Sequence, residues 1–564
     1  MTHEPKAEDT APSDATPLSR AGWLTVLLAL LAGLVLSAWC WDKTWDDAAI
    51  TLGYGRTFAR HGVVTFGAHG QRTEGFSSGL WMLVAAFLAL FAESPDRLLA
   101  WAKCANALLY VLNAACVYRL GAHYIRSQAL RVLAVVFFSL GAISVVSIPE
   151  AMENHLFLTL HLLMALAWVR TVAQPTVLSI RDISVIAALS VALVLCRLEG
   201  ALMIAAVAVA ALAGRRHGRP VNSSALWGIV VGGAGVVAVA LFRHSYFDRW
   251  LPNTVLAKTW TPYWVTPETR IIRALENVQA LLVPVCLPLA AMFWALRPNR
   301  RAVRSVLERA APMVIVVAGL LVYAAAAGTI WGTTNRIFLS IIPFMSITLL
   351  AILDHEHKRL TPGQIALACA LFAALQAPYY ANYRANSVTV AGVRALNRPA
   401  AELARRFPGK TWRLAAPDVG ATLLYWGEDI DIVDTALLNN AELSLRGWSH
   451  FDDAVLTLPL PEILETHTPW SDLARLGSSK IVRDEYEKVT IDGVFYLLRK
   501  DIVARLRQGA PTSVIIKPVT SLSETTKHEL LSRVHTDFTG DQSRVDNVWQ
   551  WDITLGGHEN TATM

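Results

Sequence analysis

The chain has 564 residues, of which 54% are hydrophobic and only 17% are charged, and its mean hydropathy is +0.40. Soluble domains carry roughly 25% charged residues. This chain instead contains apolar runs close to the about 20 residues that cross a bilayer. An ordinary soluble enzyme, a disordered protein and a disulfide-rich secreted scaffold are therefore excluded.

The net charge of +6 is divided unevenly along the chain. Residues 1–380 contain 30 Lys and Arg against 20 Asp and Glu, whereas residues 381–564 contain 20 against 24. The basic excess thus belongs to the apolar part, where membrane topology alone could demand it. The sequence contains no basic stripe of the kind that would indicate nucleic acid as a partner.

In chain order, residues 1–21 are rich in Thr, Ser, Pro, Asp and Ala, which predicts a disordered cytoplasmic leader. The first apolar run, Gly22–Trp41, is long for a signal peptide and ends in a poor cleavage site, so we expect an uncleaved anchor. Further apolar runs follow near 80–92, 98–118, 131–148, 156–169, 182–196, 200–213, 225–242, 277–296, 311–328, 337–353 and 364–378.

Five basic clusters decide which runs cross the bilayer, because Lys and Arg accumulate in cytoplasmic loops. The clusters are Arg119/Arg126/Arg131, Arg170/Arg181, Arg215/Arg216/Arg219, Arg297/Arg300/Arg301/Arg304/Arg309 and Lys358/Arg359. With twelve spans all five would face outward, and with eleven all five face inward. The run at 80–92 is the shortest, and we expect it to be re-entrant or interfacial.

The predicted fold class is a polytopic α-helical protein of the inner (plasma) membrane, with about eleven spans within 22–380. Its N-terminus would be cytoplasmic, and its outer loops would be 42–97, 149–155, 197–199, 243–276 and 329–336. Short apolar stretches between polar turns then predict a compact extracytoplasmic α/β domain at 395–560. Within it, we expect strands at Trp412–Ala416, Asp431–Val433 and Val494–Leu498, and helices at Ala401–Arg406 and Asp501–Arg507.

The first outer loop, 42–97, carries two adjacent carboxylates, Asp46 and Asp47. A helix N-cap explains one Asp and leaves the second unexplained. Adjacent carboxylates raise one another's pKa, which suits a general base for a hydroxyl acceptor. The spacing does not decide which of the two is the base. Further along the same loop, Glu74 lies in a Gly-, Thr- and Ser-containing stretch that suggests a tight, ordered loop facing the aqueous cavity, although a plain polar loop explains it as well.

The next outer loops add ionisable residues at the ends of spans. Glu153 and His155 could bind a sugar or a metal, or could simply begin a helix with a favourable dipole. Arg197 and Glu199 lie between two spans, where ionisable residues are costly and often functional, although an internal ion pair explains them equally well. Lys258 and Arg336 are candidates for the phosphate of a lipid carrier, and Arg suits phosphate because it pairs bidentately.

Taken together, the order of these motifs resembles the multi-spanning GT-C glycosyltransferases that use polyprenyl-phosphate sugars. Within that superfamily it is most similar to the actinobacterial terminal β-(1→2)-arabinofuranosyltransferases. The similarity covers most of residues 40–440, and nothing beyond about 450 matches. One departure is Leu198, where relatives commonly have Pro. The matching pieces are Asp46-Asp47, Glu74-Gly75-Phe76-Ser77-Ser78, Ala151-Met152-Glu153, Arg197-Leu198-Glu199-Gly200, Leu251-Pro252-Asn253-Thr254 through Lys258, Asn335-Arg336, Ala416-Pro417-Asp418-Val419-Gly420 and Asp431-Ile432-Val433-Asp434.

The resemblance implies transfer of a sugar, D-arabinofuranose by subfamily, from a polyprenyl-phosphate donor in the bilayer to a cell-envelope glycan or surface glycoprotein outside. Asp46 or Asp47 would take the acceptor's proton, and Lys258 and Arg336 would neutralise the leaving phosphate. A divalent cation such as Mg or Mn is permitted by the carboxylates without being required, and no metal ligands are assigned. The residues expected to line the cavity are Glu74, Glu153, His155, Arg197, Glu199 and Asn253.

Two other functions stay open at this point. The first is the same chemistry with another lipid-linked sugar, such as mannose onto protein or aminoarabinose onto lipid A. The second is a transporter or flippase, which predicts polar residues at the bilayer midplane and paired interrupted helices.

Overall fold

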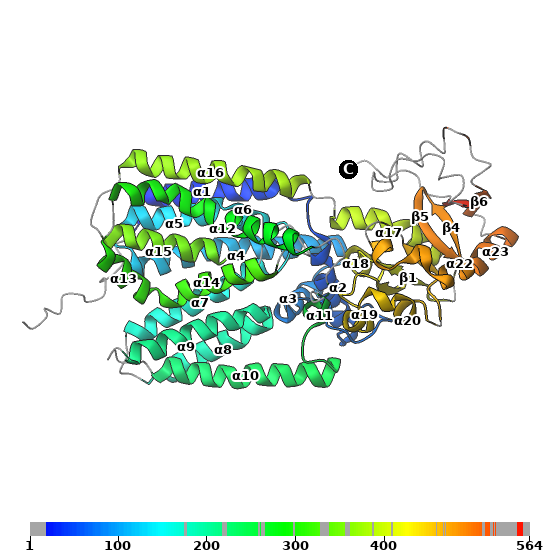
Figure 1. Cartoon of the computed structure of the whole chain (residues 1–564), viewed down its shortest axis with the longest axis horizontal. Helices are drawn as coiled ribbons and strands as arrows, with labels where there is room; N and C mark the ends of the chain where they lie inside the picture. The colour runs from blue at the N-terminus through cyan, green and yellow to red at the C-terminus, as the bar shows by residue number, and fades with distance from the viewer. Residues whose placement is uncertain are drawn as a thin grey trace, which may run out of the picture.

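The computed structural model runs along its long axis from a helical bundle at one end to an α/β domain at the other (Figure 1). The residues that it describes are 18–173, 178–216, 223–257, 260, 266–296, 299–327, 338–355, 361–385, 388–407, 410–457, 459–465, 467, 470–509, 514–518, 523, 525 and 550–555.

The bundle consists of the apolar helices of the first two thirds of the chain. All eleven runs expected to cross the bilayer overlap one of its helices, and the run at 131–148 is divided in two because Gly141 is extended (φ −64°, ψ 125°). The helices are α1 (Arg20–Trp39), α4 (Pro95–Tyr124), α5 (Gln128–Leu140), α6 (Ala142–Val146), α7 (Asn154–Ala173), α8 (Ile180–Cys196), α9 (Ala201–Arg216), α10 (Ser223–Phe247), α12 (Pro267–Leu296), α13 (Arg300–Arg309), α14 (Ala311–Ala327), α15 (Ile341–His355) and α16 (Pro362–Ala385).

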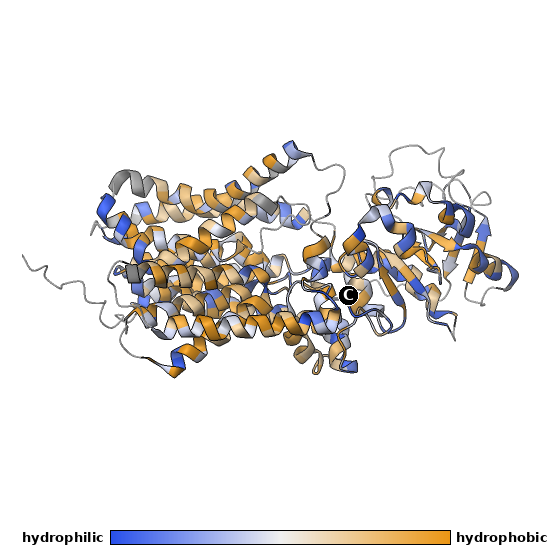
Figure 2. Cartoon of the chain, turned by 60° about the horizontal axis from the view of Figure 1, so that its bottom comes forward, coloured by the Kyte–Doolittle hydropathy of each residue, from blue (hydrophilic) through white to orange (hydrophobic). Residues whose placement is uncertain are grey.

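Within the described part of the chain, five helices are long and apolar enough to cross a bilayer by length and composition alone, and six if the bent pair α13–α14 counts as one span. The five are α1, α4, α7, α10 and α16, while α5, α9 and α15 are apolar but shorter. Apolar side chains on the outside of the bundle, such as Leu108 (74% exposed) and Val230 (60% exposed), need lipid rather than water around them. Figure 2 shows hydrophobic residues along the length of the bundle helices and mixed hydropathy in the α/β domain. The fold is that of a polytopic α-helical membrane protein with a C-terminal α/β domain.

The run at 80–92 forms a short helix, α3 (Gly79–Ala89), which begins where the Ser78 hydroxyl accepts a hydrogen bond from the Trp81 amide. Its 11 residues rise about 16 Å at 1.5 Å per residue, about half of the roughly 30 Å hydrocarbon core. It packs against α2 (Asp46–His61) between the bundle and the α/β domain (Figure 1).

The α/β domain begins with α17 (Val390–Arg405) and contains one seven-stranded sheet in the order β2-β1-β3-β5-β4-β7-β6. The three expected strands correspond to β1, β2 and β5, and the two expected helices overlap α17 and α23. The further elements are β1 (Arg413–Ala416), α18 (Gly420–Trp426), β2 (Asp431–Asp434), α19 (Ala441–Arg446), α20 (Phe451–Val455), β3 (Ile463–Glu465), α21 (Trp470–Leu473), α22 (Lys480–Glu485), β4 (Tyr486–Ile491), β5 (Val494–Arg499), α23 (Lys500–Gly509), β6 (Val514–Pro518) and β7 (Trp551–Leu555).

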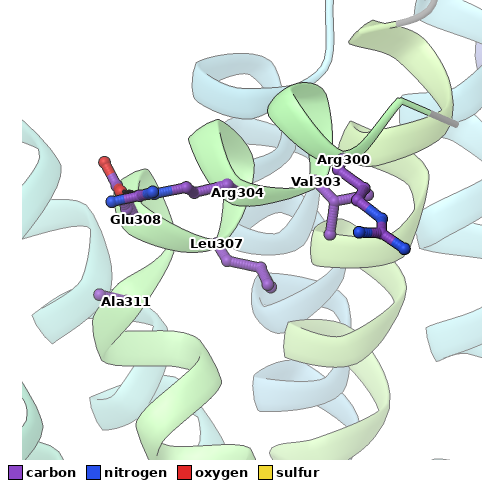
Figure 3. A pocket seen from close by; sticks show the side chains of 6 residues that line it. All are labelled: Arg300, Val303, Arg304, Leu307, Glu308 and Ala311. Atoms are coloured by element: carbon purple, nitrogen blue, oxygen red, sulfur yellow. Dashed lines mark hydrogen bonds and ion pairs between the residues drawn. The ribbon is translucent and has the colours of Figure 1, made fainter.

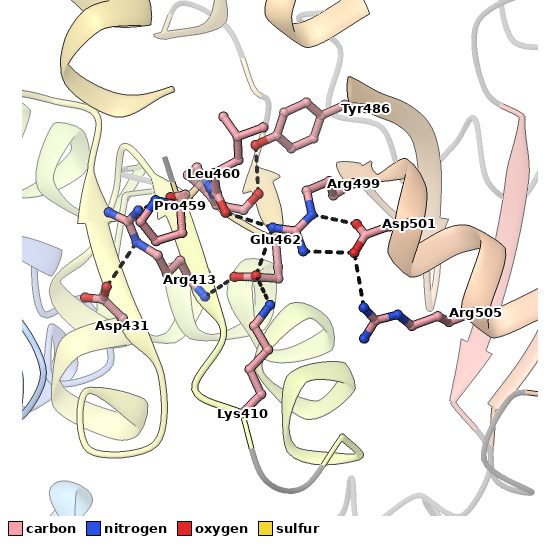
Figure 4. Close-up of polar contacts among 11 residues, drawn as sticks. Lys410, Arg413, Asp431, Pro459, Leu460, Glu462, Tyr486, Arg499, Asp501 and Arg505 are labelled. Carbon is pink, nitrogen blue, oxygen red and sulfur yellow. Dashed lines mark hydrogen bonds and ion pairs between the residues drawn. The ribbon is translucent and has the colours of Figure 1, made fainter. Parts of the chain in front are cut away.

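β1 lies between β2 and β3 and is parallel to both, so the carboxyl ends of these three strands share one edge of the sheet. At the opposite edge, the buried Glu462 carboxylate ties the amino ends together (Figure 4). It accepts hydrogen bonds from Lys410 Nζ (2.6 Å), the Arg413 amide (2.8 Å) and an Arg499 guanidinium nitrogen (3.0 Å). The carboxyl edge of the three strands lies beside α2, where Asp46 contacts the α18 amides.

The bundle and the α/β domain are joined through backbone contacts just before α2. Thr389, just before α17, pairs with Trp45 as an isolated antiparallel bridge, and the Val390 amide donates to the Thr44 carbonyl (2.9 Å). The start of α2 is therefore held by the segment that enters the α/β domain.

Candidate active site

The two adjacent carboxylates Asp46 and Asp47 begin α2, and the fold separates their surroundings. Asp46 is 4% exposed. Its Oδ2 accepts a hydrogen bond from the Gly420 amide (2.7 Å) and its Oδ1 accepts one from the Ala421 amide (2.7 Å), at the amino end of α18. A Cβ atom at Gly420 would lie 2.0 Å from the Asp46 carbonyl oxygen, so only glycine allows this approach. Burial and the nearby Asp418 carboxylate raise the pKa of Asp46, although these two hydrogen bonds act to lower it.

Asp47 follows Asp46 by one residue, a rotation of about 100° around the helix axis. Its side chain therefore leaves α2 in a different direction, and it is partly exposed. The fold thus assigns Asp46 to the contact with α18 and leaves Asp47 as the more accessible of the two carboxylates.

The carboxyl edge of β1, β2 and β3 supplies more charged groups beside α2. Asp418 follows β1, and Glu465 ends β3. His467 bridges them, with Nε2 3.2 Å from Asp418 and Nδ1 2.8 Å from Glu465. Although burial lowers it, the hydrogen bonds with these two carboxylates raise the pKa of His467 to about 10. His467 is therefore a cation at neutral pH and balances part of the negative charge at this edge.

Asp434 ends β2 at the same edge and is almost fully buried. It accepts hydrogen bonds from the Ala436 amide (2.6 Å), the Asn439 amide (2.8 Å) and Asn439 Nδ2 (2.6 Å). Burial raises the pKa of Asp434 to about 6 even though these bonds oppose the shift. Asp434 thus orients Asn439, whose Oδ1 accepts from the Tyr54 hydroxyl of α2 (3.2 Å).

The stretch around Glu74 is a buried loop that joins three parts of the molecule. Glu74 pairs bidentately with Arg243 at the end of α10, at 2.5 and 3.0 Å, and both side chains are at least nine-tenths buried. Its carbonyl accepts from the amide of Asn253, which begins α11 (Asn253–Ala257). At Gly75, a Cβ would lie 1.7 Å from Asn439 Oδ1. This loop is therefore fixed against α10, α11 and the α/β domain.

A second buried ion group joins the loops at 149–155 and 197–199. Arg197 pairs with Glu153 and, at 3.1 Å, with Glu199. The turn before Glu153 is fixed at Ala151, which has a positive φ of 56° and whose carbonyl accepts from the Trp81 indole of α3 (2.9 Å). Glu153 Oε2 and Arg197 Nε are buried without a hydrogen-bond partner among the described residues. Such unpaired buried polar atoms are uncommon and need an explanation, such as a ligand.

Of the other residues expected at the site, two are buried and two lie outside the described residues. His155 is fully buried, its Nε2 lies 2.8 Å from the Ser144 carbonyl, and its ring packs edge-on against Tyr110 and Phe138, so the structure places it in the bundle core. Asn253 is 2% exposed, and its Nδ2 has no hydrogen-bond partner in the described ranges. Lys258 and Arg336, the expected phosphate ligands, lie outside the described residues.

A cavity of about 330 Å³ lies within the bundle between α6, α12, α15 and α16. Pro284, inside the continuous helix α12, and Pro378, inside the continuous helix α16, lie at its wall. Gln376 is 4% exposed; its Oε1 accepts from the Ala142 amide (2.7 Å), while its Nε2 has no partner in the part of the chain described. The lining is aliphatic with neutral polar groups, and consists of Ile143, Gln279, Val283, Pro284, Ile342, Leu375, Gln376, Pro378, Tyr379 and Asn382.

Among the residues described, no group of three or more His, Cys, Asp or Glu is arranged to hold a metal ion. The acidic residues near α2 are instead engaged with backbone amides and with His467. Within the described ranges, these side chains form no ready ligand set for the divalent cation that the resemblance permits, and no step of the reaction is assigned to one.

Sequence reasoning missed the partners that hold this site together. Arg243 carried a usable signal, because a basic residue at the outer end of an apolar run opposes the topological trend, as it does at Arg336. Gly420 was noticed only as part of a motif, and nothing in the local sequence marks Ala421 or His467. Their roles depend on contacts with residues far away in the chain.

No family model matches the sequence, and no curated protein matches it. Among solved structures, the chain is similar to the crystal structure of ArnT from Cupriavidus metallidurans in the apo state, with 14% identity and a TM-score of 0.45, covering 91% of this chain and 95% of that one. It is likewise similar to the crystal structure of the same protein bound to undecaprenyl phosphate, with 17% identity, a TM-score of 0.46 and the same coverage. At this level of similarity, an activity for this chain has to be argued from its own residues.

Proposed function

We propose that this chain is a membrane glycosyltransferase that moves a sugar from a polyprenyl-phosphate donor to a hydroxyl group of an acceptor on the extracytoplasmic side of the inner membrane. The observation that carries the proposal is the difference between the surroundings of Asp46 and those of Asp47. The first is buried against the amides of Gly420 and Ala421, while the second is partly exposed where the bundle meets the α/β domain. A lipid-borne donor and a water-borne acceptor can meet only at such a junction.

In the proposed reaction, Asp47 acts as the general base. Its carboxylate takes the proton of the acceptor hydroxyl as the hydroxyl oxygen bonds to the anomeric carbon of the sugar. The bond between that carbon and the phosphate oxygen breaks, and its electron pair stays on the phosphate. The products are the glycosylated acceptor, polyprenyl phosphate and a protonated Asp47.

The charge left on the phosphate needs cations, and we assign them to Lys258 and Arg336. Two described arginines are less suited to this task, because Arg243 is paired with Glu74, and Arg197 is paired with both Glu153 and Glu199. Glu153 Oε2, which has no hydrogen-bond partner among the described residues, instead suits a hydroxyl of the bound sugar, since a carboxylate oxygen accepts from hydroxyl donors. The bundle cavity beside Pro284 and Pro378 suits an apolar chain that carries a neutral polar group.

The transferred sugar follows from the motif order and is D-arabinofuranose, with a cell-envelope glycan or surface glycoprotein as the acceptor. Mannose transfer to protein and aminoarabinose transfer to lipid A are the alternatives within the same chemistry. The α/β domain, whose acidic edge faces α2, would present the acceptor.

The test is transfer by the full-length protein in nanodiscs, supplied with radiolabelled polyprenyl-phosphate arabinofuranose, mannose or aminoarabinose and an envelope extract as acceptor. We expect label to enter the acceptor from the arabinose donor. Label from another donor would correct the sugar, and no transfer from any of the three would overturn the proposal.

Asp47→Asn should lower the turnover by at least about 100-fold, the usual contribution of a general base, with an unchanged melting temperature. The matched control is Asp484→Asn, which removes an exposed carboxylate on α22 that pairs with Lys480 four residues earlier. Full activity of the Asp47→Asn protein would exclude Asp47 as the base.

A flippase is the second candidate, and it is favoured by the internal prolines of two helices that line a neutral cavity. The same nanodisc preparation separates the candidates, because a flippase would bind the labelled donor without forming a glycosylated product. Movement of the lipid across proteoliposomes that form no product would favour the flippase.

A further inference from the structure

The short helix α13 closes the end of the bundle that is farthest from the α/β domain (Figure 1). It meets the apolar helix α14 at an angle of 86°. Because α14 runs with the bundle, α13 lies across the ends of the spans, nearly parallel to the surface of the bilayer. This position is typical of a helix at the interface between lipid and water.

The ten residues of α13 contain four arginines and one glutamate. Arg300 and Arg301 are exposed, and Arg304 has a 79% exposed side chain that pairs with Glu308 at 2.9 Å. On the other side of the helix, Val306 is fully buried against the bundle. A helix with one buried apolar side and a strongly basic exposed side is typical of attraction to anionic lipid.

An open hollow of about 500 Å³ lies along one face of this helix. Residues spaced three, four and seven positions apart share a helix face, which places Arg300, Val303, Arg304 and Leu307 together. Figure 3 shows Val303 and Leu307 along the helix between Arg300 on one side and the Arg304–Glu308 pair on the other. The hollow therefore has aliphatic walls, and a guanidinium stands at each side.

We propose that this hollow binds an anionic phospholipid of the leaflet that lies away from the α/β domain. The Arg300 guanidinium would donate hydrogen bonds to the lipid phosphate, a geometry that Arg favours. Arg304, which pairs with Glu308, would add positive charge on the other side of the hollow. Val303 and Leu307 would contact the upper part of the acyl chains. A free phosphate would satisfy only the arginines, whereas a phospholipid matches both the charge and the aliphatic walls.

The charges of the segment agree with this choice of ligand. Glu308 offsets one of the four arginines, so the helix keeps three positive charges. By the rule that basic loops face the cytoplasm, α13 belongs to the cytoplasmic leaflet, which is the anionic one. The inference depends on the surface of α13 alone and holds whether or not the chain transfers sugar.

The test measures lipid binding to the full-length protein, reconstituted in nanodiscs of phosphatidylcholine with increasing phosphatidylglycerol, by native mass spectrometry. Removing two basic groups from an anionic surface should weaken binding by about 30-fold. We therefore expect Arg300→Gln/Arg304→Gln to reduce the affinity for phosphatidylglycerol by this factor. Arg300→Lys/Arg304→Lys, which keeps both charges, should retain most of it.

The matched control is Arg398→Gln/Arg446→Gln, which removes two arginines of the α/β domain. Each forms an ion pair with a glutamate four positions away in the chain, as Arg304 does. Its affinity for phosphatidylglycerol should equal that of the wild type. The proposal would be overturned if this control lost as much affinity for phosphatidylglycerol as the α13 variant. It would also be overturned if phosphatidylcholine bound as tightly as phosphatidylglycerol, or if soluble glycerol phosphate competed fully.

A second measurement does not depend on how the variants fold. A photo-crosslinking phosphatidylglycerol probe added to the wild-type protein should form adducts within peptides that cover 299–311. Adducts confined to other parts of the chain would overturn the proposal.

Discussion

The Oδ2 atom of Asp46 lies 2.7 Å from the backbone nitrogen of Gly420, although the two residues are 374 positions apart. With the neighbouring bond to Ala421, this contact fixes the first turn of α2 against the first turn of α18. A negative side chain is favourable there because the amino end of a helix presents unpaired amides. The position of Asp47, on the same turn, consequently depends on the α/β domain.

Replacing Asp46 by Asn should reduce stability as well as activity. An amide offers one oxygen acceptor, so its NH2 group would face one of the two α18 amides without a partner, at a cost of about 1–3 kcal/mol. We expect a lower melting temperature for Asp46→Asn and an unchanged one for Asp47→Asn, both measured by tryptophan fluorescence in detergent. Equal melting temperatures of the two variants would contradict the separation of their roles.

Gly420→Ala tests the close approach directly. The added Cβ would lie 2.0 Å from the Asp46 carbonyl oxygen, so α2 or α18 must move, at a cost of about 1–3 kcal/mol. We expect a lower melting temperature together with reduced transfer. Gly477→Ala is the control, because a Cβ there meets nothing within 4 Å and should leave both properties unchanged. An equal effect of the two substitutions would count against the contact.

The buried pair of Glu74 and Arg243 should show strong energetic coupling. Removing one partner leaves an uncompensated buried charge, which costs about 3–5 kcal/mol. We therefore expect Glu74→Gln and Arg243→Gln each to be strongly destabilising and the double variant to be much less so than their sum.

A double-mutant cycle on Glu442 and Arg446 supplies the comparison. This exposed pair on α19, four residues apart, has a contact distance of 2.8 Å and should couple by only about 0.3–0.5 kcal/mol. Similar coupling in the two cycles would show that Glu74 and Arg243 are not held together in the folded protein.

His467 should make stability depend on pH above neutrality. Its pKa is raised to about 10 in the folded protein from an ordinary value of 6.5. The folded state therefore holds the proton more tightly. The resulting stabilisation is fully present below pH 6.5 and is lost as the pH rises through 10, by up to about 1.4 kcal/mol per pH unit.

Melting temperatures measured from pH 6.5 to 10 check this expectation. The wild-type protein should lose stability across the range, and His467→Gln should lose less of it. His450→Gln, which changes a partly exposed histidine of the same domain, should follow the wild type. Parallel curves for His467→Gln and the wild type would contradict the bridge between Asp418 and Glu465.

Much of the architecture was predictable because it depends on local composition. Apolar runs form helices wherever the lipid solvates them, and the run at 80–92 was set apart by its length and emerges as the short helix α3. Strands β1, β2 and β5 were expected from short stretches rich in aliphatic and aromatic residues bounded by turns. The sequence also singled out the adjacent carboxylates Asp46 and Asp47 and the loop around Glu74.

The sequence by itself therefore determined the class of protein, the order of its helices and the loops that carry its charged residues, because hydropathy and charge act over a few neighbouring residues. The tertiary structure alone decided that Asp46 binds α18, that Arg243 neutralises Glu74 and that His467 joins two strand ends. Each of these contacts links distant parts of the chain. Burial removes the solvent around these charged groups, so each must find a partner in space, and adjacent identical residues such as Asp46 and Asp47 acquire different roles only when the fold brings that partner to one of them.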